Sequence, residues 1–107
     1  MEQNGNGKRR VVITGLGMVS SLGNDVESSW RALVAGESGA AEITYFDHSA
    51  YPVHFACELK GFDPTEWMDR KAARRMDKFA QLALAAGRMA EADAGFDVAG
   101  EAERTGA

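Results

Sequence analysis

The chain has 107 residues, of which 45% are hydrophobic and 26% charged, with 12 Lys and Arg against 16 Asp and Glu. This length forms one domain at most, which excludes a complete multidomain enzyme, and the net charge of -4 argues against a general nucleic-acid binder. The single cysteine excludes an internal disulfide, so we expect a reducing, cytoplasmic location.

The first residues of the chain are polar. Residues 1–7 carry two glycines and no apolar anchor, which predicts a disordered leader ahead of a single unit over residues 8–107. The longest apolar stretch near the N-terminus, residues 11–19, is interrupted by Thr14, Gly15 and Gly17. We therefore expect neither a signal peptide nor a membrane span, and no membrane partner.

A strand and a helix are predicted next. Residues 11–14 (VVIT) are β-branched and predict a short strand buried on both faces, as in parallel sheets covered by helices. Asp25 occupies an N-cap position, and Gly36 predicts the end of the helix that follows. The apolar face of this helix would comprise Val26, Trp30, Leu33 and Val34.

The second half of the chain predicts one dominant helix. Residues 40–63 are irregular, with a short strand expected within residues 53–59. Pro64 takes a first helical position after Asp63, and alanine-rich residues 69–94 predict a long helix. One face of that helix would comprise Met76, Phe79, Ala80, Ala83, Gly87 and Ala90, with Gly95 as its stop and an acidic loop over residues 96–103.

The predicted sheet is incomplete. A strand buried on both faces needs partner strands, because each unpaired backbone group held away from water costs about 1–3 kcal/mol. The sequence supplies only one further short strand, which predicts that the chain is the N-terminal piece of a longer α/β protein. The alternative is a small helical domain with a single edge strand.

Three candidate sites have simple explanations. Gly15 and Gly17 match half of a dinucleotide fingerprint, but Ser20 stands at the third glycine position, so a tight turn explains them better than nucleotide binding. Cys57 lies in an alternating apolar segment, which predicts a buried, inert thiol. His48 and His54 lack a recurring metal-ligand spacing, so we expect surface loop residues and no metal.

A basic cluster carries more information. Lys71, Arg74, Arg75 and Lys78 lie at i, i+3, i+4 and i+7, which would place four cations along one side of the first helical turns. Cations near a helix N-terminus are disfavoured by its dipole, so an acidic partner would compensate them. The competing interpretation is a solvated face with Asp69 and Asp77 as counter-charges.

These residues also resemble a known family. The resemblance rests on residues 9–20 (RRVVITGLGMVS), 22–23 (LG) and 36–39 (GESG), on Trp30 and Leu33, and on residues 70–71 (RK) and 75–77 (RMD). Together they resemble the start of the β-ketoacyl-acyl carrier protein synthase II group of condensing enzymes, with synthase I and polyketide ketosynthases as alternatives. The similarity runs from about residue 8 to the last residue.

The resemblance implies the N-terminal part of a thiolase-like αβαβα fold, incomplete in this chain, within a homodimer. It also implies condensation of malonyl-acyl carrier protein with an acyl-enzyme thioester to give 3-oxoacyl-acyl carrier protein, without a cofactor. In the family the nucleophilic cysteine and two assisting histidines lie beyond the matched segment, so Cys57, His48 and His54 are not catalytic, and the fragment is expected to be inactive.

The resemblance assigns the basic cluster a role. The positions of Lys71, Arg74 and Arg75 would contact acyl carrier protein, a small acidic protein that carries the substrate on a phosphopantetheine arm. Two other functions remain as alternatives: a stand-alone interaction module that binds an acidic protein through this face, and a nucleotide-binding domain built on Gly15 and Gly17.

Overall fold

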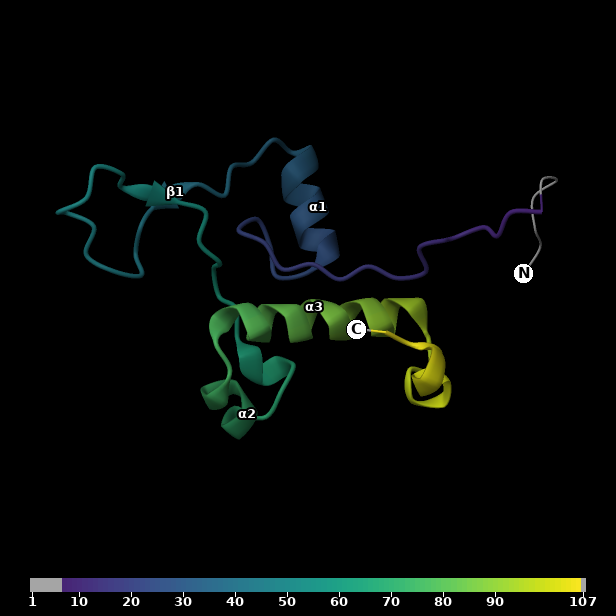
Figure 1. Ribbon diagram of the computed structural model, residues 1–107. Helices are drawn as coiled ribbons and strands as arrows, with labels where there is room; N and C mark the ends of the chain where they lie inside the picture. The colour runs from purple at the N-terminus through teal and green to yellow at the C-terminus, as the bar shows by residue number, and fades with distance from the viewer. Residues whose placement is uncertain (1–6, 107) are drawn as a thin grey trace.

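The computed structural model describes residues 7–106, so all but one residue of the predicted leader lie outside the described residues. Figure 1 shows the element order α1 (Val26–Val34), β1 (Ala41–Glu42), β2 (Phe55–Ala56), η1 (Pro64–Glu66), α2 (Arg70–Arg75), α3 (Lys78–Ala94) and η2 (Ala99–Arg104). The radius of gyration is 18.2 Å, whereas a compact domain of this length has about 13 Å. The arrangement is therefore open.

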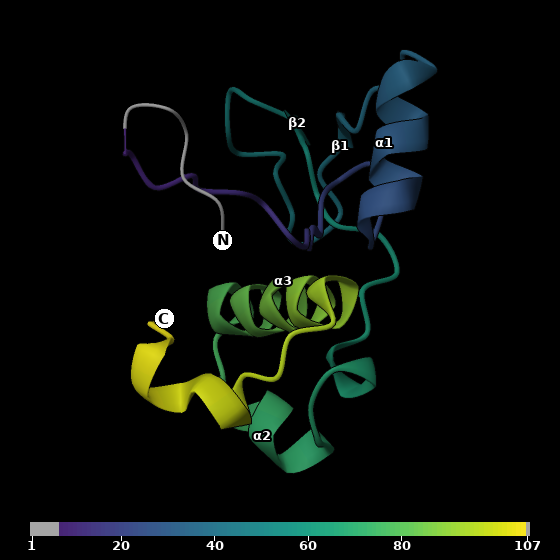
Figure 2. The same cartoon turned by 90° about the vertical axis from the view of Figure 1, so that its right-hand side faces the viewer.

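Helix α3 lies at the centre of this arrangement. Figures 1 and 2 show α1 and the β1–β2 hairpin on one side of α3, with η1 and α2 on the other. Ala85 is fully buried on α3, and Met89 is also buried. The predicted apolar face of this helix is wrong in part, because Phe79 is 75% exposed and Ala83 and Gly87 are exposed as well.

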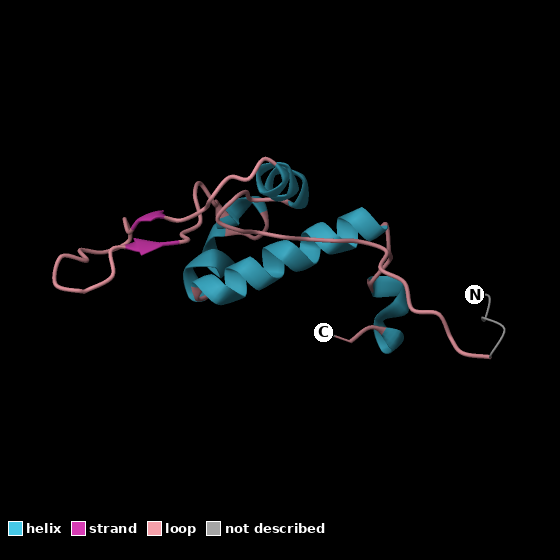
Figure 3. Cartoon of the chain, turned by 90° about the horizontal axis from the view of Figure 1, so that it is seen from above, coloured by secondary structure: helices cyan, strands magenta, loops and turns pink. Residues whose placement is uncertain are grey.

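The predicted strand over residues 11–14 does not form. Residues 8–20 carry no strand and form an extended segment, part of which runs beside α3 (Figure 3), with Val11 94% and Ile13 82% exposed. A two-sided strand is stable only between neighbouring strands. The one sheet within residues 7–106 is the β1–β2 pair, and this segment does not pair with it.

Gly15 and Gly17 allow the extended segment to touch α3. A Cβ atom at Gly15 would overlap the carbonyl oxygen of Ala90, and one at Gly17 would overlap the carbonyl oxygen of Ala86. Neither glycine has a positive φ. The expected tight turn is therefore wrong, and these glycines permit close backbone approach to a helix whose own residues are small.

Helix α1 begins and ends as predicted. The Asp25 carboxylate accepts a hydrogen bond from the Ser28 amide at 2.8 Å, and Gly36 follows the helix with a φ of 75°. Its predicted apolar face, however, lies open within the described residues, because Trp30 is 65% exposed and Leu33 and Val34 are also exposed. The residues that it buries are Ser29 and Ala32.

In the β1–β2 hairpin, strand β2 is shorter than the sequence predicted, and strand β1 was not predicted. Strand β2 covers two residues of the predicted 53–59 strand, and it pairs antiparallel with β1 in the register Ala41 to Ala56 and Glu42 to Phe55. Residues 41–42 had no strand signal, because a two-residue strand carries no detectable alternation. Figure 3 shows the two strands as magenta arrows with the hairpin loop beyond them.

The single long helix predicted over residues 69–94 is two helices. The backbone leaves the helical conformation at Met76 (φ -101°, ψ 138°) and Asp77 (φ -67°, ψ 158°), so α2 ends at Arg75 and α3 begins at Lys78. Alanine content favoured continuity, but tertiary contacts override such propensities. The predicted stop at Gly95 is confirmed, with a φ of 64°.

The segments flanking the two helices also contain short helical turns. Pro64 takes the first position of η1, as the sequence predicted. The Asp63 carboxylate caps this turn by accepting a hydrogen bond from the Thr65 amide at 2.9 Å. The expected acidic loop over residues 96–103 instead contains most of η2. Over residues 7–106, no helix is long and apolar enough to cross a membrane.

Candidate functional site

Helix α2 presents a compact group of cations to solvent. Lys71, Arg74 and Arg75 are all exposed, and Arg70 adds a fourth exposed cation at the first position of the helix. None of the ion pairs found within residues 7–106 involves these side chains; those pairs are Glu27 with Arg31, Glu42 with His48, and Glu101 with Arg104. The surface of α2 is therefore strongly positive.

The position of two of these cations differs from the sequence prediction. Because α2 ends at Arg75, Arg74 and Arg75 occupy its last turn rather than the beginning of a long helix. The negative end of the helix dipole favours cations there, by roughly 0.3–1 kcal/mol at exposed sites. The prediction that the helix dipole disfavours these cations is therefore wrong for both arginines, whereas it holds for Lys71 in the first turn of α2 and for Lys78 at the first position of α3.

The fourth member of the predicted stripe faces elsewhere. Lys78 begins α3 rather than continuing α2, so the i+7 spacing does not place it beside Arg74. Its Nζ lies 4.9 Å from the centroid of the Tyr45 ring, a cation–π contact with the hairpin loop. The cluster in this structure consists of Lys71, Arg74 and Arg75 with Arg70, and this group is called the α2 basic surface below.

The α2 basic surface stands on an anchored helix. The Asp69 carboxylate accepts a hydrogen bond from the Ala72 amide at 2.6 Å, which caps the first turn. Ala73 is buried on the side that faces the rest of the molecule, and the Gln81 side chain of α3 donates to the Ala73 carbonyl. A shallow depression lies on the solvent side, lined by Asp69, Lys71, Ala72, Arg75 and Met76.

A second polar cluster lies in the hairpin. The Nδ1 atoms of His48 and His54 are 2.7 Å apart, and His48 Nε2 lies 3.2 Å from a Glu42 carboxylate oxygen. The two histidines come together only because the hairpin closes, which their spacing did not indicate. Within residues 7–106, no group of three histidine, cysteine or carboxylate side chains is arranged to hold a metal ion.

Cys57 is exposed, so the expectation of a buried thiol is wrong. It follows β2, where the strand has already ended and its alternation no longer determines which side is covered. A reactive cysteine needs a helix N-terminus or a cation to lower the pKa of its thiol. Cys57 lies in the loop between β2 and η1 and not at a helix N-terminus.

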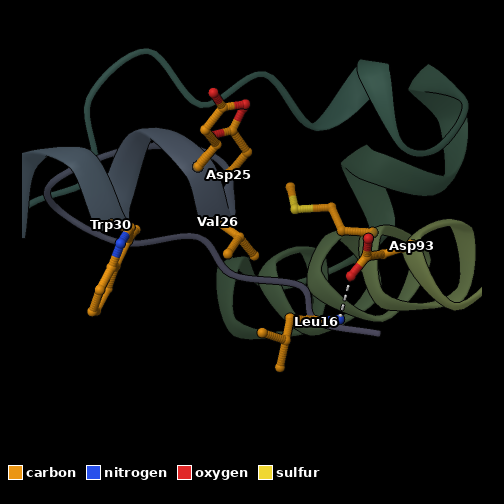
Figure 4. A pocket seen from close by; sticks show the side chains of 7 residues that line it. Leu16, Asp25, Val26, Trp30 and Asp93 are labelled. Carbon is orange, nitrogen blue, oxygen red and sulfur yellow. Dashed lines mark hydrogen bonds between the residues drawn. The ribbon is translucent and has the colours of Figure 1, made fainter. Parts of the chain in front are cut away.

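An apolar depression separates α1 from the N-terminal segment. Figure 4 shows Leu16, Val26 and Trp30 along it, with the Leu16 amide donating to the Asp93 carboxylate at 3.0 Å. Gly15 and Gly17, on either side of Leu16, press against α3 and leave no space for a pyrophosphate. The described geometry therefore gives no support to nucleotide binding at these glycines.

Comparison with known proteins gives one consistent result. Residues 8–107 match the family described as beta-ketoacyl synthase, N-terminal domain. The chain is 52% identical over 91 residues to the 3-oxoacyl-[acyl-carrier-protein] synthase 2 of Vibrio cholerae, a match that covers 85% of this chain and 22% of that protein. The protein of the same name from Coxiella burnetii is 50% identical over 91 residues, with the same coverage.

A solved structure agrees with these sequence matches. The ishigamide ketosynthase/chain length factor superimposes with a TM-score of 0.77 at 43% identity, over 85% of this chain and 23% of that chain. The present chain thus spans less than a quarter of the length of these relatives.

Proposed function

We propose that the whole protein is a 3-oxoacyl-acyl carrier protein synthase of type II. This chain belongs to the β-ketoacyl synthase family and shares the N-terminal part of its thiolase-like fold. The observation that carries this proposal is the 52% identity over 91 residues to a synthase of that name. The reaction joins an acyl-enzyme thioester to malonyl-acyl carrier protein, with loss of carbon dioxide, and releases 3-oxoacyl-acyl carrier protein.

The chemical step belongs to residues outside this segment. In the family a cysteine thiolate accepts the acyl group and two histidines assist decarboxylation, and all three lie beyond the stretch matched here. Cys57 is exposed away from any helix N-terminus, and His48 and His54 bond to each other. We therefore expect the isolated 107 residues to show no condensation, and measurable turnover by that purified piece would overturn this expectation.

The α2 basic surface is the proposed docking site for acyl carrier protein. Lys71, Arg74 and Arg75 are exposed, and no acidic side chain within the described residues pairs with them. An acidic partner gains mainly in association rate from such a surface, since exposed ion pairs contribute only about 0–1 kcal/mol each. Weak, salt-sensitive docking is what a carrier that binds and leaves in every cycle requires.

The test is a charge reversal in the full-length enzyme. Changing Lys71, Arg74 and Arg75 to Glu should raise the apparent KM for carrier-bound substrate by at least tenfold, because attraction to an acidic partner becomes repulsion. Reaction with a small acyl thioester that needs no carrier should be unchanged. Arg31→Glu is the matched control, because Arg31 is an equally exposed cation on α1 that already pairs with Glu27.

Two outcomes of this experiment would contradict the proposal. Equal loss of activity with both substrates would make the three residues structural rather than part of a docking site. If the single change Arg75→Glu raises KM no more than Arg31→Glu does, only the overall charge matters, because each of these two changes alters the net charge by the same amount. Beyond the docking site, we propose that the whole protein is a cytoplasmic homodimer, and light scattering of the purified full-length protein at two concentrations tests the oligomeric state.

A further inference from the structure

Gln81 connects α3 to the end of the helix that carries the α2 basic surface. Its side-chain Nε2 donates to the carbonyl oxygen of Ala73 at 2.8 Å and makes a longer contact of 3.5 Å with the carbonyl oxygen of Met76. Gln81 is half-buried in the structure. The two carbonyls belong to the residues immediately before Arg74 and immediately after Arg75, so one side chain holds both ends of the arginine pair.

Helix α2 needs such an external contact. It is only six residues long, and helices of this length are not stable in water without tertiary contacts. The last carbonyls of any helix lack partners within it, and here the backbone turns away at Met76 instead of supplying further amides. Gln81 supplies the missing donor at this point, together with the Met76 amide, which also reaches the Ala73 carbonyl.

The same contact accounts for the break between α2 and α3. If residues 70–94 formed one continuous helix, the Ala73 carbonyl would accept from the Asp77 amide and would not be available to Gln81. In the structure Asp77 is instead extended and is the N-cap residue that precedes α3. The bond from Gln81 therefore belongs to the broken arrangement, in which Arg74 and Arg75 lie in a last helical turn.

We propose that Gln81 is a positioning residue for acyl carrier protein docking: it holds the α2 basic surface in place through the Ala73 and Met76 carbonyls without touching the carrier. This inference rests on the docking role proposed above for Lys71, Arg74 and Arg75. The side chain of Gln81 points at backbone inside the junction, whereas the cations point to solvent.

The experiment replaces Gln81 with Met in the full-length enzyme, because Met has a similar volume and no donor. Loss of the bond should raise the apparent KM for carrier-bound substrate by about three- to tenfold, as expected for one net hydrogen bond. The kcat and the reaction with a small acyl thioester should not change. Gly87→Ala is the matched control on α3, because an added Cβ there meets nothing within 4 Å.

A double-mutant cycle separates this inference from the docking proposal. If Gln81 acts through the α2 basic surface, Gln81→Met should have no further effect on KM once Lys71, Arg74 and Arg75 are changed to Glu. Additive effects would overturn the inference while leaving the docking site intact. If the triple reversal itself has no effect on KM, the docking proposal fails regardless of what Gln81→Met does.

Hydrogen exchange distinguishes a local loosening of α2 from misfolding of the whole protein. In Gln81→Met the Met76 amide should exchange at least fivefold faster, because it shares the Ala73 carbonyl with Gln81, while amides of α1 keep their rates. Gln81→Glu should reproduce the effect, since a carboxylate places acceptors against two carbonyls. Unchanged exchange at Met76 in both variants would overturn the inference, as would faster exchange throughout α1.

Discussion

The two halves of this chain are held together by different kinds of contact. Around α2 and α3 the buried side chains of the described residues are apolar, namely Met68, Ala73, Ala85 and Met89. In the first half, Val11, Ile13 and Trp30 are exposed, and only small residues of α1 are buried. Apolar burial thus holds the second half, whereas polar links join the loops of the first half to one another, and Gly15 and Gly17 place its N-terminal segment against α3.

Lys60 is the clearest of these polar links. Its Nζ donates to the carbonyl oxygens of Ser21, Gly39 and Glu58, each at 3.1 Å, and so joins three separate loops. Asn24 adds a bond from its side-chain amide to the Lys60 carbonyl at 2.9 Å. Contacts of this kind fix where loops lie, but they stabilise less per contact than buried apolar area.

The largest effect is expected where the two halves touch. Gly17→Val would drive a branched side chain into the Ala86 carbonyl of α3, and because backbone cannot move aside easily we expect a loss of about 3 kcal/mol. Hydrogen exchange of α3 amides in the full-length protein measures this loss. Gly87→Ala, on the open side of the same helix, should instead gain about 0.5–1 kcal/mol, and similar losses in the two variants would contradict the close contact.

A smaller effect is expected from the polar links of the first half. Lys60→Met keeps the length of the side chain but leaves three carbonyls without their shared donor, which should cost about 1–2 kcal/mol because these groups are partly hydrated. Faster hydrogen exchange around residues 21–24 and 39–43 would report it. Lys71→Met is the control, because the Lys71 ammonium bonds to none of these carbonyls. In that variant, hydrogen exchange around residues 21–24 and 39–43 should not change.

These contacts also show where sequence reasoning succeeds and fails. Asp25, Gly36 and Gly95 mark helix ends through bonds and φ values that involve adjacent residues, so their positions could be predicted. The break at residues 76–77 lies beside a contact with Gln81 of the next helix, and the strand predicted over residues 11–14 would need neighbouring strands that residues 7–106 do not provide. Neither feature is visible in a local pattern.

The candidate site shows the same division. The exposure of Lys71, Arg74 and Arg75 followed from their charge, but their place in a last turn did not, because it depends on where α2 ends. The pairing of His48 with His54 and the exposure of Cys57 both depend on how the hairpin closes. The spacing of residues within one helix or strand therefore predicts which of them share a face, whereas contacts between residues that a loop brings together cannot be predicted from spacing.

Removal of one helix cap should have a moderate effect. Asp25→Ala deletes the bonds from Ser28 that begin α1, at 2.8 Å from the amide and 2.5 Å from the hydroxyl, and should cost about 1 kcal/mol. Asp77→Ala is the matched control, because Asp77 precedes α3 without making a side-chain cap bond. Hydrogen exchange of the first amides of each helix compares the two, and equal losses would contradict the capping role of Asp25.

The same cap should respond to acid. Hydrogen bonds from the Ser28 hydroxyl and amide lower the pKa of Asp25 below its ordinary value of 3.8. A lowered pKa in the folded state means that the cap stabilises α1 above pH 3.8 and that this contribution is lost as the pH falls through the lower folded value. Asp25→Asn should remove this pH dependence, and an NMR titration of the Ser28 amide measures it. If the variant gives the same titration curve, the pH dependence arises from another group.

The smallest expected effect concerns the cations of the two halves. Arg31 lies 3.1 Å from Glu27 one turn away on α1, and both side chains are largely exposed. A double-mutant cycle with Glu27→Gln and Arg31→Gln should give a coupling of about 0.3 kcal/mol that disappears in concentrated salt. A coupling of zero would mean that Arg31 is as free as Arg75 to attract an acidic partner. Arg31→Glu would then no longer control for charge alone, and only the place of the cations on α2 would distinguish the two surfaces.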